Sequence, residues 1–334
     1  MKKKAVFAII GAVLFIIVAF VLQAPDALAE AAEAQGQTGR MAMIVLGSLV
    51  FAVVWWAGNV VPDWVTGLIM VSMWLVIAKI PFSMAFSAYA KTSLWLIVGA
   101  FMLAAAITKT GLLRRISLGL MKLFPPSFRG QVLAMMSIGT LASPVMPSTT
   151  AKLVLGAKLA DSSADVLGYE HHSKGRVGLY MAAASGFMLM APAFISSSFL
   201  GYSMVSSLPE GYRDVTWMQW FLAMIPWAIL FFIIMFFAIS LFYGPKRKKG
   251  EKKAAESKTE EVPAEKHKFT KNEAITAVIM IVCLIFWILE KQSGINSGVV
   301  ALIGGLACFA TGILKNDDLK TAVPWGLILL IGAV

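Results

Sequence analysis

The residues from Leu141 to Lys152 read Leu-Ala-Ser-Pro-Val-Met-Pro-Ser-Thr-Thr-Ala-Lys and interrupt a strongly apolar part of the chain. Pro144 and Pro147 each lack a backbone N–H and clash with the preceding turn, so a helix that runs through this stretch must break. A Ser or Thr that follows the break caps the helix that restarts. The stretch therefore predicts two half-helices that meet at a polar tip. A helix that is only kinked, with its hydroxyls bonded to its own carbonyls, is the alternative.

The composition places the chain among integral membrane proteins. Of its 334 residues, 59% are hydrophobic and only 14% are charged, and several apolar runs are long enough to span a bilayer. The net charge of +11 is the mark expected of cytoplasmic loops, so we expect no nucleic-acid partner. Cys283 and Cys308 lie inside apolar runs without ligand spacing, which predicts reduced packing residues and no metal site.

The N-terminal residues 1–40 contain a membrane helix or a signal-like segment, followed by an outer loop. Three lysines, Lys2 to Lys4, precede eighteen apolar residues, and Ala27-Leu28-Ala29 follows them. This run is longer than the ~7–15 residues of a signal peptide's apolar region, which favours an uncleaved helix. Further spans are expected at residues 41–61, 64–78, 93–111, 217–243, 273–289, 294–314 and from 324 onward. Residues 245–271 form a charged cytoplasmic linker that is too poor in apolar residues to fold alone.

Residues 130–160 are predicted to form a re-entrant helical hairpin. After Ser148, only about ten residues precede Lys158 and Asp161, which at ~1.5 Å per residue cover about half of a ~30 Å hydrocarbon core. The chain is therefore expected to enter and leave on the same side. The apolar run 177–208 is interrupted by Pro192 and three serines, which predicts a second broken helix that faces the tip, with an ordinary kink as the alternative.

The distribution of basic residues sets the orientation. With the N-terminus in the cytoplasm, inner segments hold 22 Lys and Arg residues and outer segments hold five, so we expect a multi-pass protein of the cytoplasmic membrane. The segment that starts at Lys91 is echoed by the one that starts at Lys320. The predicted organisation is a first inverted repeat at 41–244 and the start of a second at 272–334. The apolar run that contains Val334 has no stop signal, so we expect the second repeat to be incomplete.

Four motifs follow one another along the chain: Trp55-Trp56 before Val61-Pro62, Trp95 to Phe101, Thr110-Gly-Leu-Leu-Arg-Arg-Ile116, and Pro147-Ser-Thr-Thr-Ala151. Their order resembles the divalent anion/sodium symporter family. The similarity covers residues 40–334 and is greatest to the branch that contains citrate/succinate and tartrate/succinate exchangers and the plastid 2-oxoglutarate/malate translocator. It implies an all-α polytopic membrane protein of elevator type, a homodimer, in which the substrate lies between two hairpin tips that bear Ser-Asn-Thr motifs.

The resemblance also implies the site residues. The first Ser-Asn-Thr motif, which forms a sodium site and half of a carboxylate site, here reads Ser148, Thr149 and Thr150, so that a Thr hydroxyl replaces the Asn amide. Two sets of site residues follow. The substrate-binding set is Ser148, Thr149, Thr150, Ser198, Gly201 and Tyr202, and the ion-binding or charge-compensating set is Ser143, Ser148, Thr149 and Lys152.

Lys152 is a candidate because a charged residue near the middle of the bilayer normally marks a pathway or a bound counter-ion. One hypothesis is that its ammonium replaces the sodium ion of symporting relatives, which would make the protein a dicarboxylate exchanger. The alternative is a side chain that snorkels to cytoplasmic water.

These features predict a secondary active transporter of small di- or tricarboxylates, by sodium symport or dicarboxylate exchange. Its expected partners are a small anion, membrane lipid and a second copy of the chain, with no cofactor other than Na⁺ as a coupling ion. The alternatives are a transporter of another divalent anion such as sulfate, an anion channel and a membrane-embedded enzyme. The chain lacks a His-Glu-x-x-His motif and a P-loop, so no catalytic residue is predicted.

Overall fold

The computed structural model describes residues 2–34, 36–206, 208–209, 212, 215–245 and 269–333, apart from the side chains of residues 199, 202, 203 and 206. In these residues all regular secondary structure is helical. The contacts divide the chain into two units, Met1–Leu94 with Pro324–Val334, and Trp95–Val323. Most of the linker predicted at 245–271 lies outside the described residues.

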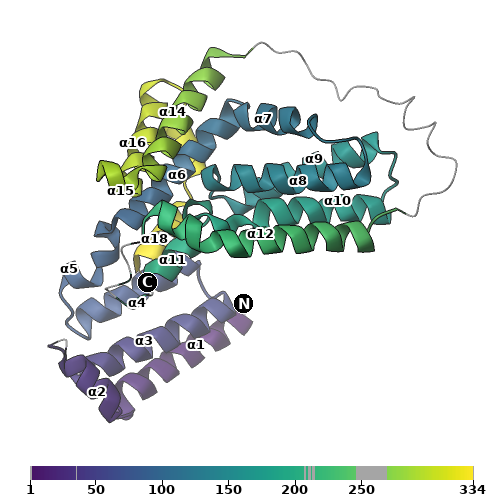
Figure 1. The fold of residues 1–334 in the computed structure, drawn as a ribbon. Helices are drawn as coiled ribbons and strands as arrows, with labels where there is room; N and C mark the ends of the chain where they lie inside the picture. Colours follow the sequence, from purple (N-terminus) through teal and green to yellow (C-terminus); the bar gives the residue numbers. More distant parts are fainter. Residues whose placement is uncertain are drawn as a thin grey trace. The chain divides into compact units, whose positions relative to one another are not determined.

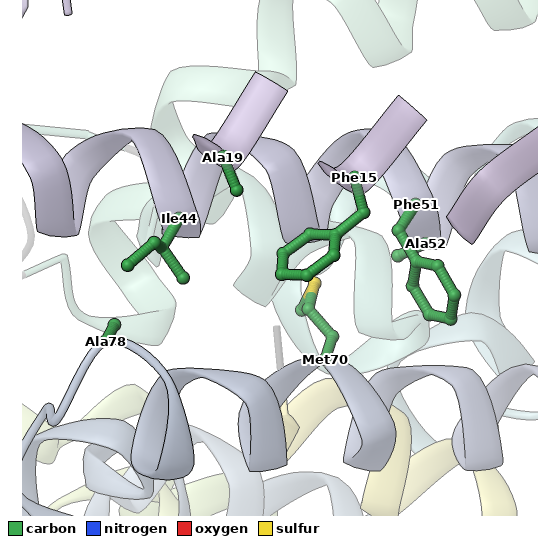
Figure 2. Packing of buried hydrophobic residues seen from close by; sticks show 7 residues of the cluster. All are labelled: Phe15, Ala19, Ile44, Phe51, Ala52, Met70 and Ala78. Carbon is green, nitrogen blue, oxygen red and sulfur yellow. The ribbon is translucent and has the colours of Figure 1, made fainter. Parts of the chain in front are cut away.

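The first unit is built on a pair of long apolar helices. Helix α1 (Lys2–Ile16) continues into a π-helical turn, η1 (Ile17–Val21), and both lie along α3 (Gly39–Gly58). A Cβ atom at Gly47 would lie 3.1 Å from the Cβ of Ala19, so the absence of a side chain allows the close approach. Figure 2 shows the apolar cluster that α1 and α3 share with the following helix, in which Phe15, Phe51 and Met70 are buried.

The segment between α1 and α3 is not only a loop. Residues Asp26–Glu33 form a short helix, α2, which packs on α3, and Asp26 lies in its first turn, where a negative charge favours a helix N-terminus. Thr38 then caps α3 by accepting a hydrogen bond from the N–H of Met41, and α3 ends at Asn59 in the left-handed conformation.

Helix α4 (Asp63–Val76) follows a tight turn and packs against α18 (Trp325–Ala333). The two helices run parallel, because Trp64 faces Gly326 and Gly67 faces Leu330. Two short helices, α5 (Phe82–Ala85) and η2 (Ser87–Ala90), precede the next long helix, and Tyr89 Oη donates a hydrogen bond of 2.8 Å to the Leu329 carbonyl.

In the second unit, α6 (Thr92–Lys109), which lies in this unit from Trp95 on, makes the equivalent contact with α16 (Ser297–Ala310). These helices also run parallel, because a Cβ at Gly99 would lie 2.6 Å from the Ala301 oxygen, and one at Gly304 would lie 3.2 Å from Leu103. The second helix of each predicted repeat thus packs on the third helix of the other. This reciprocity supports the inverted repeat, which stays a prediction.

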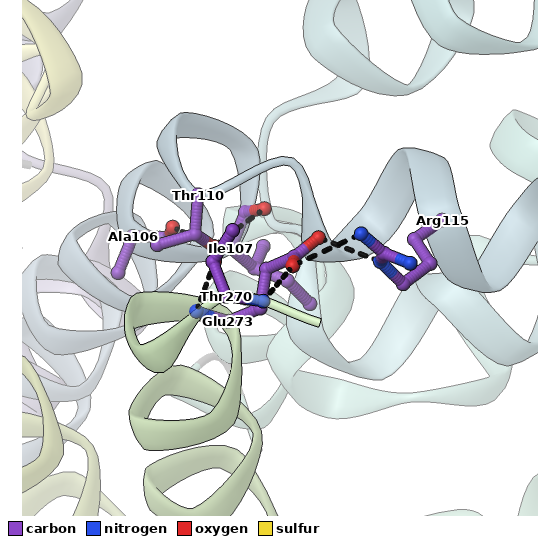
Figure 3. Close-up of polar contacts among 6 residues, drawn as sticks. All are labelled: Ala106, Ile107, Thr110, Arg115, Thr270 and Glu273. Atoms are coloured by element: carbon purple, nitrogen blue, oxygen red, sulfur yellow. Dashed lines mark hydrogen bonds and ion pairs between the residues drawn. The ribbon is translucent and has the colours of Figure 1, made fainter. Parts of the chain in front are cut away.

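A polar contact joins α7 (Leu112–Met121) to the start of α14 (Lys271–Ile288), as Figure 3 shows. Arg115 Nε and Nη2 lie 2.7 and 3.2 Å from the two carboxylate oxygens of Glu273. Glu273 and Thr270 also form a capping box, which satisfies the first N–H groups of α14. The chain continues through α15 (Glu290–Ser293) to α16, and α17 (Asn316–Ala322) precedes α18.

Four helices of the second unit lie side by side in Figure 1: α8 (Phe128–Ala142), α9 (Thr149–Val166), α10 (Lys174–Ala184) and α12 (Trp217–Phe242). The α8–α9 pair is an antiparallel hairpin. Its two ends meet, because the ring of Phe128 lies 6.2 Å from the ring of Tyr169, which follows α9.

The second helix of the hairpin continues beyond the predicted end of the hairpin at residue 160. Helix α9 has 18 residues and continues through Lys158 and Asp161. Arg176 explains the extension, because it pairs with Asp165 and lies 3.6 Å from Asp161, so that the polar end of α9 is held against α10.

The described residues contain five helices that are long and apolar enough to cross a membrane, and α4 and α16 are shorter apolar helices. The five are Lys2–Val21, Gly39–Gly58, Thr92–Lys109, Trp217–Phe242 and Lys271–Ile288. Together with the helical fold, they make the chain a multi-pass membrane protein.

We expect the hairpin to be re-entrant from the cytoplasm. In a variant without Cys283 and Cys308, single cysteines at Arg129 and Lys174 should both react with an impermeant thiol reagent only from the inner side. A cysteine at Lys291 is the control for the outer side. Labelling of the cysteines at Arg129 and Lys174 from opposite faces would show that the segment crosses the bilayer and is not re-entrant.

Candidate functional site

The tip of the α8–α9 hairpin is a true break in the helix. Helix α8 ends at Ala142, a 3₁₀ turn, η3 (Ser143–Val145), follows, and Met146 is extended. Ser148 is the N-cap of α9 and accepts a hydrogen bond of 3.3 Å from the N–H of Ala151. The kinked-helix alternative is therefore wrong for this stretch.

The run 177–208 is broken in a comparable way. Helix α10 passes through a π-helical turn, η4 (Ser185–Leu189), and two 3₁₀ turns, η5 (Ala191–Ala193) and η6 (Ile195–Ser197), before α11 (Phe199–Ser206) begins. Ser198, between η6 and α11, is extended. The second predicted broken helix is thus present in the fold.

Each break exposes backbone carbonyls that a continuous helix would have paired, and one carbonyl of each break accepts a hydrogen bond from a side chain of the other segment. Ser196 Oγ donates to the Pro144 carbonyl over 2.7 Å. In return, Lys152 Nζ donates to the Ser197 carbonyl over 2.9 Å and to Ser197 Oγ over 2.8 Å. Ser196, Ser197 and Lys152 are all buried, so the tip and the second break form one structure.

Lys152 is fully buried, with 0% of its surface exposed. It reaches across to the second break and does not snorkel to a surface, so that alternative is wrong. Among the described residues no carboxylate contacts its ammonium group. A buried ion without a counter-charge costs several kcal/mol, and a bound anion would lower this cost.

The other predicted residues fall into three groups. Ser148 and Thr149 are half-buried and Thr150 is exposed at the start of α9, where by helix geometry the first N–H groups have no intrahelical acceptor. Ser198 is half-buried directly after the residue that binds Lys152. In the described chain, the hydroxyls of Thr149, Thr150 and Ser198 bind no other protein group, and are thus open to a ligand.

The remaining three residues are less direct candidates. Ser143 is buried, and its hydroxyl donates to the Gly139 carbonyl over 2.9 Å, which ties it back to α8. Gly201 is buried, and a Cβ there would lie 3.1 Å from the Ile195 oxygen, so it allows α11 to pack on η6. The side chain of Tyr202 lies outside the described residues.

Sequence reasoning missed the residues that support the second break from α12. Trp217 Nε1 donates to Ser196 Oγ over 3.0 Å, and Trp220 Nε1 donates to the Pro192 carbonyl over 2.9 Å. Both tryptophans lie in the first turn of a long apolar helix, where an indole normally indicates an anchor at the membrane–water interface. No sequence signal separates that role from support of a break.

The arrangement can bind an anion through unpaired N–H groups, hydroxyls and one fixed positive charge. Within the described residues, no group of three or more His, Cys, Asp or Glu side chains is placed to hold a metal ion. The sequence model of the family described as the sodium:sulfate symporter transmembrane region matches residues 3–334. The chain belongs to this family. The predicted resemblance and the all-α polytopic fold class are thereby confirmed.

This member of the sodium:sulfate symporter family is similar to several transporters and membrane proteins of bacteria and plants. A putative malate transporter, YflS, of Bacillus subtilis is 26% identical over 70% of this chain and 50% of the relative. The chloroplastic dicarboxylate transporter 2.1 of Arabidopsis thaliana is 30% identical over 73% of this chain and 44% of the relative. The inner membrane protein YbhI of Escherichia coli is 24% identical over 74% of this chain and 53% of the relative. The chain spans about half the length of these relatives.

Proposed function

We propose that the protein is a secondary transporter of small dicarboxylate anions, and that the hairpin tip and the second break form half of its binding site. The observation that carries this proposal is the fully buried Lys152, which has no carboxylate partner among the described residues and lies beside the starts of α9 and α11. The names of the malate and dicarboxylate transporters among its relatives support the same substrate class.

One carboxylate group of the substrate lies at the N-terminus of α9. Its oxygens accept hydrogen bonds from the first N–H groups of the helix and from the hydroxyls of Thr149 and Thr150, and the positive end of the helix dipole favours its charge. Ser198 contributes from the start of α11, with Gly201 and Tyr202 behind it. The ammonium of Lys152 compensates the anion's charge from the interior, and Ser143 and Ser148 hold the tip in shape.

The other carboxylate binds to the second half of the site. The matched residues cover only 50% and 44% of these two relatives, which supports a second hairpin from the second inverted repeat. An elevator-type movement, a homodimer, a place in the cytoplasmic membrane and a cytoplasmic N-terminus belong to the same proposal. The family description makes Na⁺ the coupling ion of symporting members.

Sulfate is the second candidate substrate, because the family description names it. A single tetrahedral dianion would place both charges at one spot, whereas a dicarboxylate separates them, which suits two helix ends from two repeats.

The test is transport by the full-length protein in proteoliposomes. We expect saturable uptake of labelled malate or succinate that is stimulated by unlabelled dicarboxylate inside the vesicles and needs no sodium. Competition by citrate, tartrate and sulfate ranks the substrates. Non-saturable uptake without counterflow would indicate a channel, conversion of the label to a product would indicate an enzyme, and preference for sulfate would overturn the carboxylate assignment.

A further inference from the structure

Glu290 holds an unusual position between two helix ends. It is 9% exposed, and its carboxylate oxygens accept hydrogen bonds from the N–H of Trp217 over 3.1 Å and from the N–H of Ser297 over 2.9 Å. Trp217 and Ser297 are the first residues of α12 and α16. One carboxylate thus caps two helices, and its charge is stabilised by both positive helix ends. Among the described residues no Lys or Arg pairs with it.

The side chain of Trp217 connects this capped end to the candidate site. Its indole N–H donates to Ser196 Oγ over 3.0 Å, and Ser196 Oγ donates to the Pro144 carbonyl at the hairpin tip over 2.7 Å. The direction of these bonds is fixed, because an indole can only donate. Ser196 must therefore accept from Trp217 and is left to point its single proton at Pro144.

The Trp217 ring stacks on two other aromatic rings. It stacks on Trp287 with ring centroids 6.2 Å apart and on Phe221 at 5.7 Å. Trp287 is fully buried and donates from Nε1 to the Ser297 carbonyl over 3.1 Å. The backbone of Ser297 therefore contacts Glu290 through its N–H and Trp287 through its carbonyl. This fixes the position of Trp217 from its backbone and from its ring.

We infer that Glu290 and Trp217 are positioning residues for anion binding. The Glu290 carboxylate fixes the first turn of α12, the Trp217 indole orients the Ser196 hydroxyl, and that hydroxyl holds the hairpin tip against the second break at Pro144. Neither residue touches the anion. The inference rests on the proposed function, because it assigns these residues to the shape of the same site.

Each test variant removes a single hydrogen bond. Trp217→Phe keeps an aromatic ring and removes the N–H, and Glu290→Gln removes the charge and one acceptor. We expect the KM of dicarboxylate exchange by the full-length protein to rise by about three- to tenfold in each, which is the range expected for loss of one buried hydrogen bond. The maximal rate should stay within about twofold, since the loss acts on binding.

Two control variants test whether comparable substitutions elsewhere in the protein alter KM. Trp227→Phe alters a tryptophan of the same helix that stacks on Phe231, and it should leave KM unchanged. Glu273→Gln alters a carboxylate that is also buried, but this carboxylate lies in the first turn of α14 and binds Arg115. The variant should lower thermal stability without changing KM.

A double-mutant cycle of Trp217→Phe with Ser196→Ala is the decisive measurement. If both residues act through one bond, the double variant should raise KM no further than Ser196→Ala alone. Additive effects on KM, or unchanged KM in both Trp217→Phe and Glu290→Gln while the wild type exchanges normally, would overturn the inference alone. The cycle decides by itself if Glu290→Gln does not fold. Absence of transport by the wild type would overturn the proposed function, and the inference with it.

Discussion

Replacement of Lys152 by alanine is expected to lower dicarboxylate exchange by at least about 100-fold in the absence of sodium. Removal of one partner from a buried charge pair costs ~3–5 kcal/mol, because the other charge remains buried without compensation. In this site the remaining charge is that of the bound carboxylate. The measurement is the exchange rate of labelled malate in proteoliposomes across a range of substrate concentrations.

Sodium should partly rescue the Lys152→Ala variant. The substitution leaves the carbonyl and hydroxyl oxygens of Ser197, which Nζ contacts at 2.9 and 2.8 Å, without a donor, and such oxygens are suitable ligands for a small cation. In the wild type the ammonium occupies this place, so exchange should not require sodium. A fixed positive charge also cannot leave with the substrate, which favours exchange over net uptake.

Lys158→Ala is the matched control. Lys158 is exposed on the same helix, so its removal should leave both exchange and sodium dependence unchanged. Strict sodium dependence of the wild type, or unchanged exchange by Lys152→Ala, would contradict the assignment of Lys152 as the compensating charge.

The two breaks could be predicted from the sequence because their signals are local. Proline removes a backbone donor, and serine or threonine caps the helix that follows. Both signals are present in the Leu141–Lys152 stretch and in the run 177–208, so each break could be predicted. The end of α9 could not be predicted in this way. The helix continues through Asp161 because Arg176, from the next helix, pairs with its acidic residues.

The partners of the site residues were also beyond the sequence. Lys152 binds a main-chain carbonyl, that of Ser197, and any residue type offers such a group. Glu290 lies in the polar stretch Glu-Lys-Gln-Ser between two spans, where a charge is normally solvated. Glu290 is buried because the first turns of α12 and α16 meet around it. These helices begin at Trp217 and Ser297, which are 80 residues apart in the sequence. A single sequence contains no pattern that predicts contacts between residues so far apart.

Substitution of Gly139 by alanine is expected to destabilise the protein strongly, although alanine normally stabilises a helix by ~1 kcal/mol relative to glycine. Gly139 of α8 faces Gly186 in the π-helical turn of the second broken helix. A Cβ at Gly139 would lie 2.8 Å from the Gly186 Cα and still closer to its carbonyl carbon. Likewise, a Cβ at Gly186 would lie 2.6 Å from the Cα of Met136. The atoms on both sides are backbone, so the added methyl group can be accommodated only if the two helices move apart.

The cost of such overpacking is ~1–3 kcal/mol or more, and it acts where the hairpin meets the second break. Ser143, one turn beyond Gly139, binds the Gly139 carbonyl, so a displaced α8 carries the tip with it. We therefore expect Gly139→Ala to lower both the unfolding temperature and the affinity for dicarboxylate. Gly119→Ala is the matched control, because Gly119 is a helical glycine of α7 with no atom within 4 Å of its added Cβ, and alanine should be neutral or stabilising there. Thermal unfolding of the purified protein, with and without malate, measures both effects. If Gly139→Ala were as stable as Gly119→Ala and bound malate normally, α8 and the second broken helix would not pack through these two glycines.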